Sequence, residues 1–162
     1  MYHAVNSNSR HHGSGYLWGF SAVEILIAVA ILALLMAIAV PAYENYTDKK
    51  NITIAKADIV EIQAAIDKFY ISNNRFPDSL ADIGKDSMKD PWNTSYFYTN
   101  VSKAKNKGNV RKDKNLTPVN SDYDLYSAGK DKQTKLPFTA KDSRDDIVRC
   151  NNGAYIGLAE DY

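Results

Sequence analysis

The chain has 162 residues, of which 44% are hydrophobic and 24% are charged, and its formal net charge is +1. This composition fits one globular domain with an added segment, because domains usually contain about 100–150 residues. It excludes a chain that is disordered throughout, and the near balance of charge indicates neither nucleic acid nor an acidic substrate as a partner.

The first predicted element is a long apolar helix. Residues 20–42 carry only three interruptions, Ser21, Glu24 and Pro41. About 20 apolar residues span a bilayer as an α-helix. The polar segment before it, residues 1–19, ends in a glycine, whereas a secretory signal peptide places its apolar core before the cleavage motif. The sequence therefore predicts a membrane-spanning segment that is not a secretory signal peptide.

Glu24 is a carboxylate within this apolar segment. An ionised Glu in a membrane helix costs about 3 kcal/mol on insertion scales, so it calls for a partner. The simplest interpretation is that its side chain extends to the lipid headgroups. A more specific one needs a cut between Gly19 and Phe20, which would create an α-amino group near the depth of Glu24. A neighbouring subunit's amine would then neutralise the carboxylate.

The stretch "GFSAVE", the apolar run and the following "PAYENY" together resemble the N-terminus of type IV prepilins and the related pseudopilins. The resemblance implies that an aspartyl prepilin peptidase in the inner membrane cleaves after Gly19 and methylates the amine of Phe20. It also implies that Glu24 and Pro41 serve assembly of a filament.

The resemblance divides the chain into three parts. Residues 1–19 are the prepilin leader peptide, residues 20–42 are the helix that spans the membrane and later forms the filament core, and residues 43–162 are a globular periplasmic or extracellular domain. All three histidines, His3, His11 and His12, would leave with the leader. Without imidazole, and with Cys150 alone, familiar nucleophile pairs and zinc sites cannot form, so no enzyme is expected.

Beyond Pro41 the helix is predicted to continue with one apolar face. Apolar residues recur there at spacings of three and four: Ile52, Ala55, Ile59, Ile62, Ile66 and Phe69. Such a stripe ordinarily packs on the domain's own sheet. The helix should end near Ser72, before two asparagines and a proline, and a kink or local melting at Pro41 stays open.

The rest of the chain predicts a short helix over residues 79–83 and a small antiparallel sheet of four strands or fewer, with strands at "TSYFYTN" and "YDLYSAG". The fold class is therefore α+β and pilin-like. Between these strands lies a basic block: Lys103, Lys105, Lys107, Arg111, Lys112 and Lys114. The simplest interpretation is a solvated hairpin loop; contact with DNA, anionic lipid or a neighbouring subunit stays open.

Near the C-terminus, four aspartates lie in one loop-rich stretch: Asp131, Asp142, Asp145 and Asp146. Ca²⁺ prefers six to eight oxygen ligands, and one cysteine cannot close the region with an intramolecular disulfide. "DPWNTSYFY" and "YDLYSAGKD" are similar to the major pseudopilin of type II secretion, and this resemblance implies Ca²⁺ ligands at Asp131, Asp145, Asp146 and the carbonyl of Ala128. The alternative is a solvated acidic loop, because Lys130 and Lys132 oppose a cation.

The expected function is a structural subunit of a type IV pilus or a type II secretion pseudopilus. The expected partners are other copies of the chain, the prepilin peptidase, an inner-membrane assembly platform and minor pilins or pseudopilins, with no nucleic acid. The subunit would be a single-pass inner-membrane protein before it enters a periplasmic pseudopilus or an extracellular pilus. Two other classes stay open, an anchored binding module that does not polymerise and a membrane-tethered enzyme.

Overall fold

The computed structural model describes residues 19–104, 107–114 and 118–162. Contacts divide the chain into two compact units, residues 1–42 and 43–162. Pro41 is the second-last residue of the first unit. Residues 1–18, with the three histidines and most of the leader peptide expected from the sequence, lie outside the described residues.

Helix α1 (Ala22–Asn73) is one uninterrupted element of 52 residues that crosses the unit boundary. It stays helical through Pro41, so the local melting considered from the sequence does not occur. Proline has no N–H, so one helical hydrogen bond is missing at that turn. The helix ends within one residue of the predicted position, where Asn74 adopts a left-handed conformation with φ of 52°.

In the first unit, α1 is apolar and its side chains are exposed. All described residues before the boundary are exposed, among them Leu26, Leu34 and Ile38. The helix is long and apolar enough to cross a membrane, by its length and composition. In the described part of this unit nothing covers these side chains.

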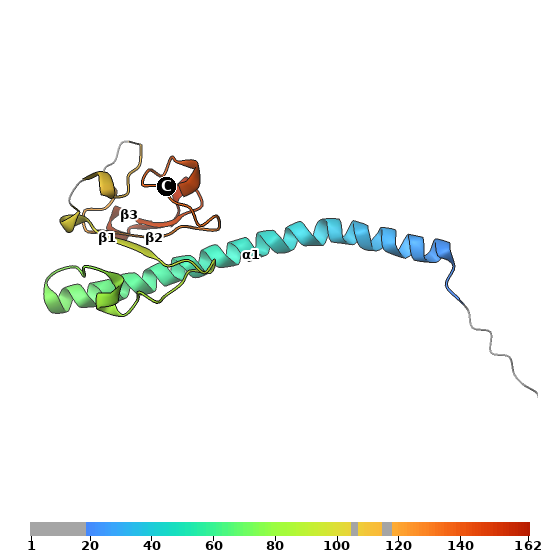
Figure 1. Ribbon diagram of the computed structural model, residues 1–162, viewed down its shortest axis with the longest axis horizontal. Helices are drawn as coiled ribbons and strands as arrows, with labels where there is room; N and C mark the ends of the chain where they lie inside the picture. The colour runs from blue at the N-terminus through green and yellow to red at the C-terminus, as the bar shows by residue number, and fades with distance from the viewer. Residues whose placement is uncertain (1–18, 105–106, 115–117) are drawn as a thin grey trace, which may run out of the picture. The chain divides into compact units, whose positions relative to one another are not determined.

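In the second unit, the described residues form a four-stranded antiparallel sheet in the order β1-β2-β3-β4. Figure 1 shows β1, β2 and β3 in yellow to red, and the sheet confirms the predicted α+β fold. Both sequence-predicted strands are present. The bounds are β1 (Phe97–Asn100), β2 (Tyr123–Ser127), β3 (Ile147–Cys150) and β4 (Tyr155–Leu158). The short 3₁₀ helices are Leu80–Ile83, Val101–Lys103, Lys107–Asn109, Lys141–Ser143, Asn151–Gly153 and Ala159–Asp161.

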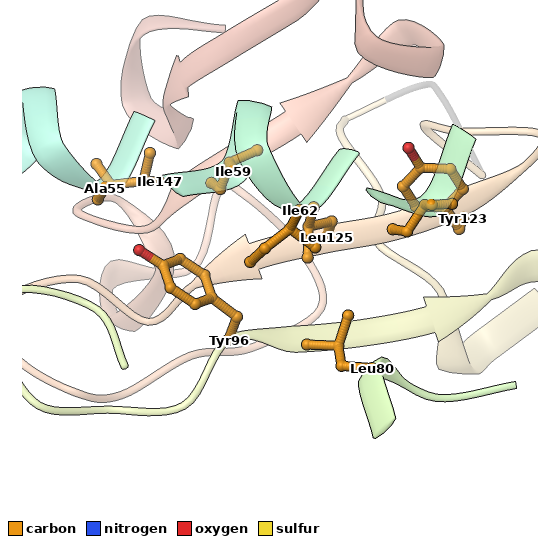
Figure 2. Close-up of a cluster of buried hydrophobic side chains, with 9 residues drawn as sticks. Ala55, Ile59, Ile62, Leu80, Tyr96, Tyr123, Leu125 and Ile147 are labelled. Carbon is orange, nitrogen blue, oxygen red and sulfur yellow. The ribbon is translucent and has the colours of Figure 1, made fainter. Parts of the chain in front are cut away.

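The main hydrophobic core lies between α1 and one face of the sheet. The predicted helical stripe supplies four fully buried residues, Ala55, Ile59, Ile62 and Ile66. Figure 2 shows α1 side chains beside Leu125 and Tyr123 of β2 and Ile147 of β3. Burying one such isoleucine contributes about 1.5–3 kcal/mol, so the stripe is a principal contact of the unit.

The opposite face of the sheet is covered as well. A second cluster joins strand residues to the C-terminal loops: Val119, Tyr126, Phe138, Val148, Cys150 and Ala159. Every residue of β2 and β3 is therefore buried. Polar groups that enter this second face must find partners there, because water cannot reach them.

Candidate functional site

The start of α1 holds Glu24 in a local pair of hydrogen bonds. The N–H of Glu24 donates to Oγ of Ser21 over 3.2 Å, and the N–H of Ser21 donates to Oε2 of Glu24 over 3.4 Å. This reciprocal arrangement is a capping box, which satisfies N–H groups that the first helical turn leaves free. A carboxylate in the first turn also interacts favourably with the helix dipole. The S-x-x-E spacing in "SAVE" predicts this cap, but Glu24 was considered only as a side chain that extends to the headgroups or as a partner for an amine.

The predicted cleavage site lies outside the helix. Gly19 and Phe20 come before the first helical residue, and both are exposed, with 79% of the Phe20 surface accessible. A β-carbon added at Gly19 would meet no other atom within 4 Å. Because the bond is exposed and not helical, it has the accessibility that proteolysis requires.

The acidic loop does not gather its carboxylates at one point. Asp131 is exposed and its Oδ1 accepts the N–H of Gln133 over 2.7 Å, while Oδ2 of Asp145 accepts the N–H of Asp131 over 3.0 Å. Asp146 is fully buried and points to a different partner, described below. Within the described ranges, no three His, Cys, Asp or Glu side chains lie together as metal ligands.

A close approach of two backbone segments brings Asp131 next to Asp145. Gly129 has φ of +66°, and a β-carbon there would collide with the backbone carbonyl of Asp145. Only glycine accommodates both the left-handed geometry and the contact. Ala128 is fully buried beside this turn. The turn therefore places the predicted calcium-loop segments against each other through backbone groups, with carboxylates that already accept protein N–H groups.

Asp146 binds an arginine from the basic block. Nη2 of Arg111 lies 2.6 Å from Oδ2 of Asp146, and the two side chains are 2% and 0% exposed. Nη1 of Arg111 donates to Oγ1 of Thr134 over 2.7 Å and to the carbonyl of Lys135 over 2.8 Å. The hydroxyl of Thr134 in turn donates to Oδ2 of Asp146 over 2.7 Å. We call these four residues, with the rings of Tyr126 and Phe138, the Arg111 cluster.

The interpretation of the whole basic block as solvated was wrong for Arg111. Its guanidinium lies 4.3 Å from the ring centre of Tyr126 and 4.8 Å from that of Phe138. Its planar fork both stacks on rings and bonds several acceptors, which suits a buried site. Among the other residues of the block, Lys103 pairs with Asp78, Lys112 is half-buried, Lys114 is exposed, and Lys105 and the Lys107 side chain lie outside the described part.

Burial shifts the titration of the carboxylates on this face. Burial raises the pKa of Asp146 to about 6, and the attraction of Arg111 together with the Thr134 hydroxyl opposes the rise. The pKa of Asp124 is also raised by burial, against hydrogen bonds from the Arg111 N–H at 2.6 Å and from Asn120 at 2.9 Å. For both carboxylates, the free-energy cost of removing the charge from water exceeds the stabilisation that the hydrogen bonds and the guanidinium provide.

A second buried arginine links the sheet to α1. Arg149 of β3 lies 2.7 Å from Asp122, donates to Gln63 of α1 over 2.9 Å and lies 3.9 Å from the ring centre of Tyr123. On the opposite face, Cys150 is a free, fully buried thiol, and burial raises its pKa to about 12. The sequence alone did not single out Arg149, because its partners come from 26 to 86 residues away.

Sequence comparison finds relatives of this chain among secretion-system and pilus proteins. Type II secretion system core protein G of Pseudomonas aeruginosa is 30% identical over 135 residues, covering 70% of this chain and 83% of that protein. The chain belongs to the type IV pilin and pseudopilin family. Core protein G of Pectobacterium carotovorum is 35% identical over 65 residues, covering 40% of this chain and 42% of that protein.

Shorter matches reach the pilins of the family. Type IV major pilin protein PilE1 of Neisseria gonorrhoeae is 29% identical over 66 residues, covering 41% of this chain and 40% of the pilin. No protein-family model and no solved structure matches the chain. The predicted family and fold are thus confirmed for this pilin-family chain. Cleavage at Gly19, the assembly roles of Glu24 and Pro41, and calcium binding stay predictions.

Proposed function

We propose that this chain is a structural subunit that a prepilin peptidase cleaves after Gly19 and that polymerises through the apolar part of α1. The observation that supports this most is the uncovered surface of that part. Its exposed Leu, Ile and Val side chains would each gain about 1.5–3 kcal/mol on burial. Lipid covers them before assembly, and equivalent helices of other copies cover them afterwards, so the subunit has a stable place in both states.

The Glu24 carboxylate is available for a partner in the filament. Its hydrogen bond from Ser21 is long, at 3.4 Å, and a carboxylate can accept several bonds at once. The α-amino group that cleavage would create on Phe20 is a cation of suitable charge. A Glu24 carboxylate paired with the Phe20 amine of a neighbouring copy sets the axial register between subunits.

The pseudopilus of a type II secretion system is the first candidate for the assembled form. The match to a core protein G extends over 70% of this chain, whereas the pilin PilE1 matches 41%. The subunit would then reside in the inner membrane and be drawn by an assembly platform, with minor pseudopilins, into the periplasm. A type IV pilus is the second candidate, which the shorter pilin matches favour.

The first experiment tests processing and assembly together. The full chain is expressed with a prepilin peptidase, and the mature protein is identified by mass spectrometry. We expect the wild type to begin with a methylated Phe20 and Gly19→Leu to remain full-length in the membrane. Gly15→Leu, which changes another glycine of the leader, is the matched control and should be processed. Filaments that retain residues before Phe20 would contradict the proposal.

A second experiment separates the two candidate assemblies. Deletion of the gene should abolish export of folded proteins and leave surface fibres intact if the chain builds a pseudopilus. Loss of surface fibres with normal secretion would instead assign it to a pilus. An anchored binding module would give neither phenotype and would keep an uncleaved N-terminus, which would reject polymerisation altogether.

A further inference from the structure

The Arg111 cluster joins three parts of the chain through an ion pair and hydrogen bonds. It brings together the segment before β2, the loop that follows β2 and the residue that begins the return into β3. The partners of Arg111 in this cluster lie 23, 24 and 35 residues away along the chain. Among the described residues, Cys150 is a free thiol and no disulfide links these parts.

We propose that the Arg111 guanidinium, and not a bound divalent cation, is the positive charge that fastens the loop of residues 128–146 to the sheet. The loop needs a cation because Asp146 is fully buried, and an unpaired buried carboxylate is costly. Arg111 satisfies that need at 2.6 Å and uses its second amino group to hold Thr134 and Lys135 of the same loop. One guanidinium therefore supplies both the charge and the cross-link.

The neighbouring acidic groups do not form a competing cation site. Asp131 and Asp145 each accept a backbone N–H, and Lys130 pairs with Asp48 of α1 over 2.7 Å. Among the described residues, Oδ1 of Asp146 is buried and has no hydrogen-bond partner, so it is the carboxylate oxygen of this residue that is left for an added ion. An ion bound there would lie beside the guanidinium and be repelled by its like charge.

Arginine suits this place because of its shape as well as its charge. The guanidinium lies within 5 Å of two aromatic ring centres, Tyr126 and Phe138, and its fork reaches three acceptors in different directions. Lysine is a point charge on a flexible chain and would not hold the same acceptors together. The site is therefore specific for arginine, and Arg111→Lys should not restore it.

The test uses the full chain in detergent micelles. Melting is followed by near-ultraviolet circular dichroism, which reports the aromatic packing of the second unit, in excess CaCl₂ and in excess EDTA. We expect the wild-type Tm to be the same in both. Arg111→Met and Arg111→Lys should each lower Tm by several degrees, whereas Lys112→Met, which removes the adjacent half-buried lysine, should leave it nearly unchanged.

Limited trypsin digestion adds a local readout. Lys130, Lys132, Lys135, Lys141 and Arg144 offer cleavage sites on the loop, and all are exposed. At a temperature where the wild type is intact, cleavage should begin in the loop of Arg111→Met and not in that of Lys112→Met.

A wild-type Tm that rises with CaCl₂ and falls with EDTA would overturn the proposal, as would equal Tm values for Arg111→Met and Lys112→Met. The wild-type titration decides the matter even if Arg111→Met does not fold.

Discussion

Ser21 and Glu24 exchange two hydrogen bonds in opposite directions, so the first turn of α1 is closed by the same carboxylate that was expected to serve assembly. The two roles can be separated by substitution. Glutamine also forms a capping box, but it carries no charge. Alanine removes both the cap and the charge.

We predict that Glu24→Gln and Glu24→Ala both insert and are cleaved but yield few filaments, because the Phe20 amine lacks its anion. Ser21→Ala keeps the carboxylate, weakens only the cap by about 1 kcal/mol, and should assemble normally. Filament yield from sheared material, measured against total processed subunit, provides the check. A normal yield from Glu24→Gln together with a low yield from Ser21→Ala would show that the cap, not the charge, limits assembly.

The core stripe provides a prediction about stability. Ile62 is fully buried between α1 and the sheet, so Ile62→Ala should lower the free energy of unfolding of the second unit by about 2–5 kcal/mol. Val60 lies two positions away on the same helix but is 54% exposed, so Val60→Ala is the matched control and should cost much less. Chemical unfolding of the full chain in detergent, followed by fluorescence, compares the two. Similar losses would mean that the stripe is not the main contact.

The raised pKa of Asp146 predicts a pH dependence. Its pKa is about 6 in the folded state against a usual 3.8, so the folded state holds this proton more firmly and stability falls as pH rises from about 4 to 6. The groups that act on it are Arg111, which lowers its pKa, the Thr134 hydroxyl, which does the same, and Asp145, which raises it. Above about pH 6, Asp146 is ionised in both the folded and the unfolded state, so its contribution to stability no longer changes with pH.

Arg111→Met removes the attraction, so the pKa of Asp146 should rise further and the loss of stability should continue to higher pH. The Tm difference between the wild type and Arg111→Met should then be larger at pH 8 than at pH 5. Melting curves at the two pH values measure it. In the double variant Arg111→Met with Asp146→Asn, the added pH dependence should vanish; its persistence would assign it to another carboxylate, such as Asp124.

Cys150 should behave as an inert thiol. It is fully buried in the second hydrophobic cluster, and burial raises its pKa to about 12, so almost no thiolate forms at neutral pH. Iodoacetamide should leave the native chain unmodified and label it fully after denaturation, as measured by the mass of intact protein. Rapid labelling of the native chain would show that this face of the sheet opens readily.

The elements that depend on local pattern could be predicted from the sequence. The spacing of Ile59, Ile62 and Ile66 predicts the buried face of α1, and the aromatic runs predict β1 and β2, because period and propensity are carried by neighbouring residues. The N-terminal motif likewise predicts the family. Each of these inferences needs only residues that are close together in the chain.

The Arg111 cluster could not be predicted in this way. Arg111 lies in a run of lysines, which is typical of a solvated loop, and its burial depends on Asp146 and on the rings of Tyr126 and Phe138, which only the fold brings near. The calcium role expected for Asp146 came from the resemblance to a pseudopilin motif, and its contact with Arg111 could not be inferred from that motif. The partner of a buried charged residue can lie far away in the chain, as Asp146 lies 35 residues from Arg111, and no pattern of neighbouring residues then identifies it.

The order of the sheet bears on how the second unit folds. Each strand pairs with the strand that precedes or follows it in the chain, so the sheet needs shorter loop closures than the packing of α1 against it. Helix α1 makes its links to them over long separations, such as 38 residues between Asp58 and Tyr96 and 86 between Gln63 and Arg149. The amphipathic half of α1 is synthesised before the strands that bury it, so its isoleucine stripe is exposed to aggregation until those strands have formed.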